Sequence, residues 1–218
     1  MNSTTISLIR KMHKTSLVHL ILNLSIAIMV YLPLDAIALE KTGLNHPSAL
    51  LTAVNEQLQI NNYMSGYFEQ RKFIHILPQP LSSRGKFIFD HSGNQASTLE
   101  WIVTTPIESH LIFNHQGIQQ KHEGRVVWQA SNQHAGVTTI GRILKAVLST
   151  NWSILESYFS IEGHIQEQAW QLQLIPQEEQ LKNVIARITL QGGTRLQKMT
   201  IFEKNSDRTE LKFYTIAP

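Results

Sequence analysis

The sequence predicts a mainly β fold with helical insertions, an α+β chain built on an antiparallel sheet. Three observations predict it. Apolar and polar residues alternate over many short stretches, turn signals separate these stretches, and helical periodicity is confined to a few segments. Strands and helices do not alternate along the chain, so neither a parallel sheet nor a dinucleotide-binding βαβ unit is expected.

The N-terminus predicts an export signal. The chain has 218 residues, which suits one domain preceded by a targeting segment. A basic start (residues 10–14) precedes an apolar stretch (17–34), and Ala36-Ile37-Ala38 gives the small-x-small pattern that a signal peptidase cleaves. We therefore expect a signal peptide at 1–38 and a single domain at 39–218. The alternative, an uncleaved membrane anchor, also places the domain outside the cytoplasm.

Charge and cysteine content exclude several classes of function. The chain has 19 Lys and Arg and 16 Asp and Glu, a net charge of +3. Without residues 1–38, 16 basic and 15 acidic residues remain, so the domain is close to neutral. It lacks the positive excess with which nucleic-acid-binding proteins neutralise phosphates. The absence of cysteine excludes disulfides, thiolate metal sites, a cysteine nucleophile and a lipid-modified N-terminal cysteine.

The first half of the domain predicts a helix followed by a β-meander. Asn45-His46-Pro47 is typical of a helix start, and apolar residues from Leu50 to Leu58 then share one face. The turn signal Glu123-Gly124 closes the last hairpin of the meander. Strands are expected at 64–73, 85–90, 99–103, 111–113, 118–122 and 125–130.

The second half predicts two helices and then more strands. From Ile140 to Leu148, apolar residues recur at i, i+3, i+4, i+7 and i+8, which indicates an amphipathic helix. Ser153-x-x-Glu156 predicts a capping box for a second, short helix. The polar segment 177–182 is expected to be a connection. Strands at 159–164, 170–175, 184–191, 196–203 and 209–216 bring the total to about ten or eleven.

No motif supports catalysis. The sequence contains no H-E-x-x-H, G-x-S-x-G, P-loop or G-x-G-x-x-G pattern. His110, His115 and His122 lie on adjacent predicted strands or turns, so a zinc site is conceivable, but their spacing favours ordinary surface imidazoles. The adjacent residues Glu178 and Glu179 are interpreted as solvent-exposed carboxylates on a loop. We expect no enzyme activity, no metal and no cofactor.

Every second residue of the predicted strands is apolar. These side chains and the apolar face of the helix at 140–148 are expected to be buried in one shared interior. Periodicity alone leaves two arrangements open: an ordinary packed core, which it favours, or an incomplete barrel whose concave face is covered by helices and could hold an acyl chain. The candidate lining residues are Phe87, Phe89, Trp101, Val103, Leu111, Phe113, Val126, Trp128, Ile143, Leu144, Val147, Leu148 and Trp170.

Five stretches, in this order, resemble the LolA-like family of periplasmic outer-membrane lipoprotein carrier proteins. They are Gly66–Lys72 with its F-x-Q pattern, Pro80–Phe89, Leu99–Pro106, Trp170–Pro176 and Ile188–Gly192. The resemblance covers roughly residues 48–216. It is to a variant branch, because the family's Arg-Pro-x-x-Phe-x-Trp pattern is incomplete: Trp101 and Pro106 are present, whereas the arginine, which bonds to the lid in the best-known carriers, is absent.

The resemblance implies a strongly curved, incomplete antiparallel β-barrel of about 10–11 strands, covered by a helical lid. It implies a monomeric carrier in the periplasm of a Gram-negative bacterium. The carrier would shield the acyl chains of lipoproteins, or of another lipid, during transfer toward the outer membrane. The implied partners are an acylated lipoprotein or lipid cargo, an inner-membrane donor and an outer-membrane acceptor, with no nucleic acid and no stable membrane insertion after cleavage.

One alternative function remains open. The same fold could serve as a non-catalytic periplasmic interaction or accessory module with a packed core. The interior separates the two functions, because a carrier needs space for an acyl chain under the lid, whereas a docking module can be packed solid.

Overall fold

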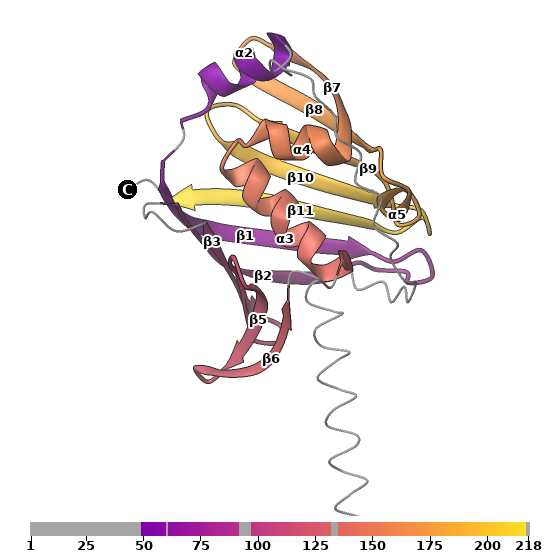
Figure 1. Cartoon of the computed structure of the whole chain (residues 1–218). Helices are drawn as coiled ribbons and strands as arrows, with labels where there is room; N and C mark the ends of the chain where they lie inside the picture. Colours follow the sequence, from indigo (N-terminus) through magenta and orange to yellow (C-terminus); the bar gives the residue numbers. More distant parts are fainter. Residues whose placement is uncertain (1–48, 60, 92–96, 132–134, 217–218) are drawn as a thin grey trace, which may run out of the picture.

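The computed structural model describes residues 49–59, 61–91, 97–131 and 135–216. They form an eleven-stranded antiparallel sheet that curves around two of the helices (Figure 1). The strands are β1 (Tyr63–Phe73), β2 (Leu81–Asp90), β3 (Thr98–Thr105), β4 (Ser109–Phe113), β5 (Gly117–His122), β6 (Arg125–Ser131), β7 (Phe159–Gln166), β8 (Ala169–Pro176), β9 (Ile185–Gly192), β10 (Leu196–Glu203) and β11 (Arg208–Ile216). The helices are α2 (Ala49–Gln57), α3 (Ala135–Leu148), α4 (Trp152–Tyr158) and α5 (Glu179–Lys182).

The sheet consists of two meanders joined edge to edge. Its strand order is β6-β5-β4-β3-β2-β1-β11-β10-β9-β8-β7, so every strand pairs with its neighbour in sequence except at the β1–β11 junction. As a result β6 and β7 lie at opposite edges of the sheet, although they are consecutive strands in the chain. The segment between them contains α3 and α4 and therefore has to cross from one edge to the other. The predicted curved, open antiparallel sheet is confirmed.

Alternating burial along the strands creates one inner face. In β1 every second residue from Gly66 to Lys72 is buried and the residues between them are exposed. Register places buried residues of neighbouring strands side by side: Phe68 of β1 pairs with Gly85 of β2 and with Phe213 of β11. Side chains that alternate in this way put all their apolar members on one face of the pleated sheet. This inner face is the concave one and carries the core.

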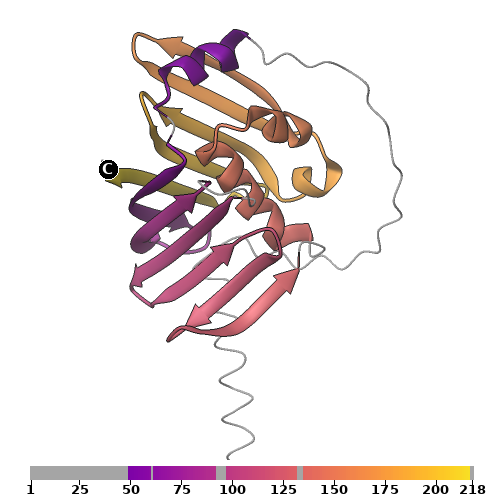
Figure 2. The same ribbon diagram turned by 60° about the vertical axis from the view of Figure 1, so that its left-hand side comes forward.

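The helices α3 and α4 lie against the concave face (Figure 2). Val147 of α3 and Leu155 of α4 belong to the same buried cluster as Trp101 of β3, which confirms the predicted shared interior. Gly141 permits the close approach of α3, because a Cβ at this position would overlap the ring of Phe113 on β4.

The first helix is also confirmed within the described part of the chain. Leu51 and Val54 of α2 are buried, and Leu50 and Leu58 pack against the core. Its predicted start at 45–47 lies outside the described residues. Over the ranges that the structure describes, no helix is both long and apolar enough to cross a membrane.

Two local predictions were wrong. Asn151, not Ser153, is the N-cap of α4: its side-chain Oδ1 accepts from the backbone N of Ile154 at 3.3 Å and from Ser153 Oγ at 2.8 Å. The helix starts earlier than the capping box requires, since Asn satisfies a free N–H of the first turn as well as Ser does. The connection 177–182 is partly helical as α5, with Lys182 Nζ donating to Glu179 Oε1 at 2.7 Å.

Candidate functional site

The concave interior gathers nearly all of the predicted lining residues. Apart from Val126 and Trp128, every one of them belongs to the single buried core cluster beneath α3 and α4. Trp128 is partly buried and packs against this cluster. The residues brought together in the core are Phe87, Phe89, Trp101, Val103, Leu111, Phe113, Ile143, Leu144, Val147, Leu148 and Trp170.

The prediction that Val126 faces this interior was wrong, because its side chain is 48% exposed. β6 is an edge strand, and its register against β5 shifts: Lys121 pairs with Val126, and Gln120 with Trp128, so Val127 is an extra residue. An extra residue in a strand interrupts the alternation of side chains between the two faces of the sheet. Val126 and Trp128, which lie on either side of it, therefore point to different faces. The alternation in the sequence carries no sign of this bulge.

A pocket lies under the covering helices. It has a volume of about 30 Å³ and sits where the end of α3 and the start of α4 meet the sheet and the β9–β10 turn. Four predicted residues line it: Phe87, Val147, Leu148 and Trp170. The other lining residues are Leu58, Gln59, Met64, Thr150, Trp152, Arg195, Leu196 and Phe213.

Sequence reasoning missed these other lining residues for two different reasons. Phe213 alternates with exposed neighbours along a predicted strand, so the pattern indicates that it is buried but does not indicate that it borders this pocket. Gln59, Thr150 and Arg195 lie in connections, and no periodicity assigns such residues to an interior. Their position depends on how distant connections meet; the backbone N of Gln59, for example, donates to the carbonyl oxygen of Thr194 at 2.9 Å.

The pocket is too small for an acyl chain as it stands. Ligand pockets usually measure about 300–1,000 Å³, whereas a single water needs roughly 10–15 Å³ measured in this way. A space of about 30 Å³ accommodates one or two waters. This pocket is therefore closed to an acyl chain in the described structure, and a chain could enter it only if α3 or α4 moved away from the sheet.

The covering segment is joined to the sheet mainly through apolar side chains. Ile143, Leu144 and Val147 contribute non-directional contacts, which depend on buried area. A directional contact is also present, as Lys145 Nζ donates to the carbonyl oxygen of Ser97 at 3.3 Å.

The joint between α3 and α4 is stabilised within the segment itself. The backbone N of Asn151 donates to the carbonyl oxygen of Ala146 at 2.8 Å, and that of Thr150 to Val147 at 3.2 Å. These bonds need no partner in the sheet, so they remain intact if the two helices move together.

A buried charge cluster occupies another part of the concave face. Lys72 of β1 is 5% exposed and forms an ion pair and hydrogen bond with Glu203 of β10, which is 8% exposed. Asp207 Oδ2 lies 3.9 Å from the same ammonium group. Burial raises the pKa of Glu203 above its ordinary value, and the hydrogen bond from Lys72 lowers that pKa only in part. This cluster lies among the inner-face residues and was not predicted.

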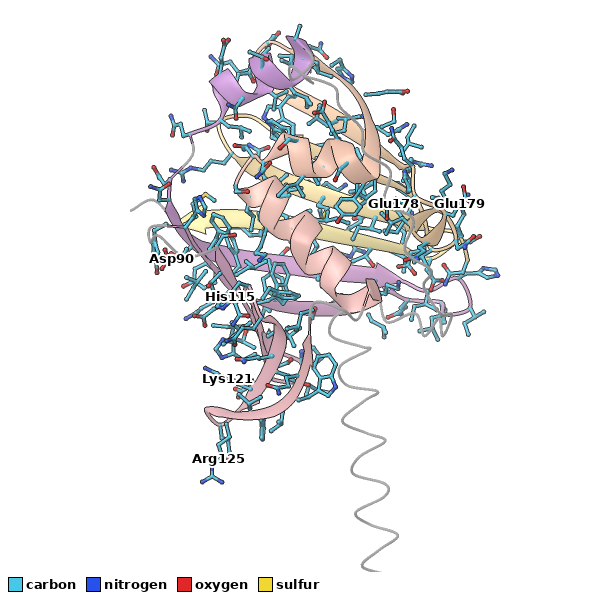
Figure 3. All side chains as sticks on the ribbon, viewed as in Figure 1. Asp90, His115, Lys121, Arg125, Glu178 and Glu179 are labelled. Carbon is cyan, nitrogen blue, oxygen red and sulfur yellow. The ribbon has the colours of Figure 1, made fainter. Side chains whose placement is uncertain are left out.

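The polar residues weighed as sites lie elsewhere. His110 Nε2 is 2.7 Å from Glu100 Oε2 on the outer face. Glu178 and Glu179 are exposed beside α5 (Figure 3). Considering the described ranges alone, no three His, Cys, Asp or Glu side chains are placed to hold a metal ion.

Comparison with known proteins gives one family match. The model of a family described as "Outer membrane lipoprotein carrier protein LolA-like" matches residues 67–212. A comparison with curated protein sequences gives no match.

Several solved structures are distantly similar. LprF from Mycobacterium bovis is 11% identical with a TM-score of 0.37, over 78% of this chain and 90% of that one. The LolA superfamily protein NE2245 from Nitrosomonas europaea is 8% identical with a TM-score of 0.37, over 76% and 90%. The MucA/MucB complex of Pseudomonas aeruginosa is 14% identical with a TM-score of 0.38, over 78% and 56%.

Proposed function

The chain belongs to the family of LolA-like outer membrane lipoprotein carrier proteins, and from this premise we propose that it is a periplasmic carrier that shields acyl chains between the sheet and the α3–α4 segment. The cargo is an acylated lipoprotein or another lipid, received from an inner-membrane donor and passed to an outer-membrane acceptor. The carrier works as a monomer, and α3 and α4 act as its lid.

The observation that supports this proposal most strongly is the nature of the covering contacts. The concave face is apolar over most of its area, and its cover meets it through side chains such as Leu144 and Val147 rather than through a ladder of backbone hydrogen bonds. Apolar contacts need only area and shape, so an acyl chain can replace those of the helices. The sheet, by contrast, is held by continuous backbone pairing and stays intact when the helices move.

The energy available from an acyl chain is sufficient for such an exchange. Each CH₂ removed from water contributes roughly 0.8 kcal/mol, so a sixteen-carbon chain contributes on the order of 10 kcal/mol. Without cargo the same apolar face is covered by the chain's own helices, which explains why the described structure is closed. A carrier that closes when empty exposes no large apolar surface to the periplasm.

The experiment uses two glycine variants that destabilise different parts of the protein. In Gly141→Ala the new Cβ overlaps Phe113 and pushes α3 away from the sheet, whereas in Gly85→Ala it overlaps the backbone oxygen of Ile102 within the sheet. Both should unfold at lower urea concentration. Only Gly141→Ala should take up a fluorescent long-chain acyl probe faster than the parent, because only it weakens the closed state of the lid.

Two results would count against the carrier. One is a parent protein, purified from the periplasm without detergent, that yields no lipid or lipopeptide by mass spectrometry of its solvent extract and binds no acyl probe. The other is equal probe uptake by Gly141→Ala and Gly85→Ala. Either would favour the alternative, a non-catalytic interaction module with a packed core. The same purified sample tests export: intact mass should show that the mature chain begins at Leu39.

A further inference from the structure

Arg195 lies in the turn between β9 and β10 and has no protein anion beside it among the described residues. Within the described residues its guanidinium forms no ion pair and no side-chain hydrogen bond, although it is only partly exposed. Arg208, in contrast, pairs with Glu210 at 3.0 Å, and Arg187 stacks on the ring of Phe202 at 3.8 Å. The guanidinium of Arg195 is therefore available to an anion from outside the chain, which would have to displace only water.

The rest of the surroundings of Arg195 are mostly apolar. It lines the pocket under α3 and α4 together with Leu58, Leu196 and Trp170. Phe213, another lining residue, stands edge-on to the ring of Phe87 at 5.7 Å and to that of Trp101 at 6.3 Å, so the pocket borders the aromatic centre of the core. A single cation at the margin of an apolar interior matches a ligand with a long apolar tail and one anionic group.

A second lining residue also has an unused donor. Trp152 is 5% exposed, and its indole Nε1 has no acceptor. Its neighbour in the pocket lining, Trp170, is satisfied, because its Nε1 donates to the carbonyl oxygen of Gly193 at 2.7 Å. Buried tryptophan N–H groups usually have a partner, so the donor of Trp152 is available for an acceptor on a ligand.

From these observations we infer that the Arg195 pocket is a head-group subsite for an anionic amphiphile, whose carboxylate or phosphate oxygens bind the Arg195 guanidinium and accept from Trp152 Nε1. The inference rests on the proposed carrier function and makes it more specific. The acyl tail of the ligand lies under the raised helices, while the head group stays at the pocket margin beside the β9–β10 turn. An arginine suits this role because its planar group binds carboxylates and phosphates with paired hydrogen bonds.

The test compares two ligands that share a tail and differ in charge. Hexadecanoate and hexadecanol are titrated at submicellar concentrations against the full mature protein at low salt. The parent should bind hexadecanoate at least about tenfold more tightly than the alcohol, and added salt should reduce this preference. Arg195→Gln should bind the two equally, whereas Arg195→Lys should retain part of the preference. A matched control, Lys204→Gln, removes an exposed cation outside the pocket and should behave like the parent.

One more variant and a competition experiment distinguish the head-group subsite from binding of a free anion. Trp152→Phe should weaken hexadecanoate binding several-fold without lowering the urea midpoint, because it removes a donor that has no partner in the closed protein. Inorganic phosphate alone should not compete at millimolar concentration, since the tail supplies the affinity; if it does compete, a free anion is the ligand and the inference is wrong. A parent that binds both amphiphiles equally also overturns the inference but leaves the carrier intact. A parent that binds neither overturns the carrier itself.

Discussion

Phe68 and Trp101 stack face to face although they lie on strands at either side of β2. Their ring centroids are 3.8 Å apart and their planes differ by 22°. Phe68 of β1 pairs in register with Gly85 of β2, and the Cζ of its ring would be 2.9 Å from a Cβ at that position. Glycine at position 85 thus leaves room for the Phe68 ring that stacks on Trp101. Both rings are about 1% exposed and belong to the buried core of the concave face.

The stack predicts a large effect for Gly85→Ala. The added methyl group overlaps both the Phe68 ring and the backbone oxygen of Ile102. A backbone atom within a sheet cannot relieve the overlap by changing rotamer, as a side chain can. We expect a loss of unfolding free energy of about 2–3 kcal/mol, at the upper end of the range for overpacking. Urea unfolding measures it. Gly193→Ala is the control, since the nearest atom to its added methyl group is Gln168 O at 3.1 Å; equal losses in the two variants would contradict the explanation.

The pocket predicts different outcomes for two acidic substitutions on α3. Val147 lines the pocket together with Arg195, so in Val147→Glu the carboxylate has a cavity and a nearby cation, and we expect a loss of about 1–2 kcal/mol. Leu144 is 3% exposed and does not line the pocket. Leu144→Glu therefore buries an unpaired charge and should cost about 4 kcal/mol or more, or prevent folding.

The two α3 variants are compared by urea midpoint and acyl-probe binding. Val147→Glu should fold and lose binding, because its carboxylate competes for Arg195. Similar midpoints for both variants would show that the space beside Val147 is unimportant.

The pH dependence of stability should reveal Glu203. Burial raises its pKa above the ordinary 4.5, so the folded chain holds this proton to a higher pH than the unfolded chain does. The stabilisation from the bound proton is complete below pH 4.5 and is lost as the pH rises through the raised pKa. Glu203→Gln cannot titrate. The unfolding free energy of the parent minus that of Glu203→Gln should therefore fall as the pH rises above 4.5, as measured by urea unfolding. A rise would mean that the attraction to Lys72 outweighs burial.

The helix cap supplies a small but clean prediction. Asn151→Ala removes the acceptor for the Ile154 N–H and should reduce the unfolding free energy by about 1 kcal/mol. Ser153→Ala removes only a donor to that same Asn side chain and should have less than half this effect. Thermal unfolding of both variants checks this. A larger loss in Ser153→Ala would restore the capping box predicted from the sequence.

Local patterns predicted most of the sheet and much of the interior. The alternation around Trp101 or Trp170, and the periodicity from Ile140 to Leu148, are properties of single elements, and burial follows them closely. Such patterns persist because each element has to bury one face whatever its neighbours are.

What the sequence did not predict depends on contacts between distant segments. The bulge that exposes Val126 arises from pairing at a sheet edge, and the β1–β11 junction joins the two ends of the domain. Arg195 reaches the pocket only because the β9–β10 turn meets the α2–β1 connection. The closed interior likewise reflects how well side chains from both meanders fill it, which no single stretch encodes.

The two ends of the covering segment continue into β6 and β7, the opposite margins of the sheet. The covering segment is therefore tethered to both margins of the sheet, so a movement of the helices is coupled to a movement of these margins. Flattening or tightening the curvature of the sheet changes the room beneath the helices. A second protein that holds the margins could thus control loading and release from outside, without reaching the bound chain.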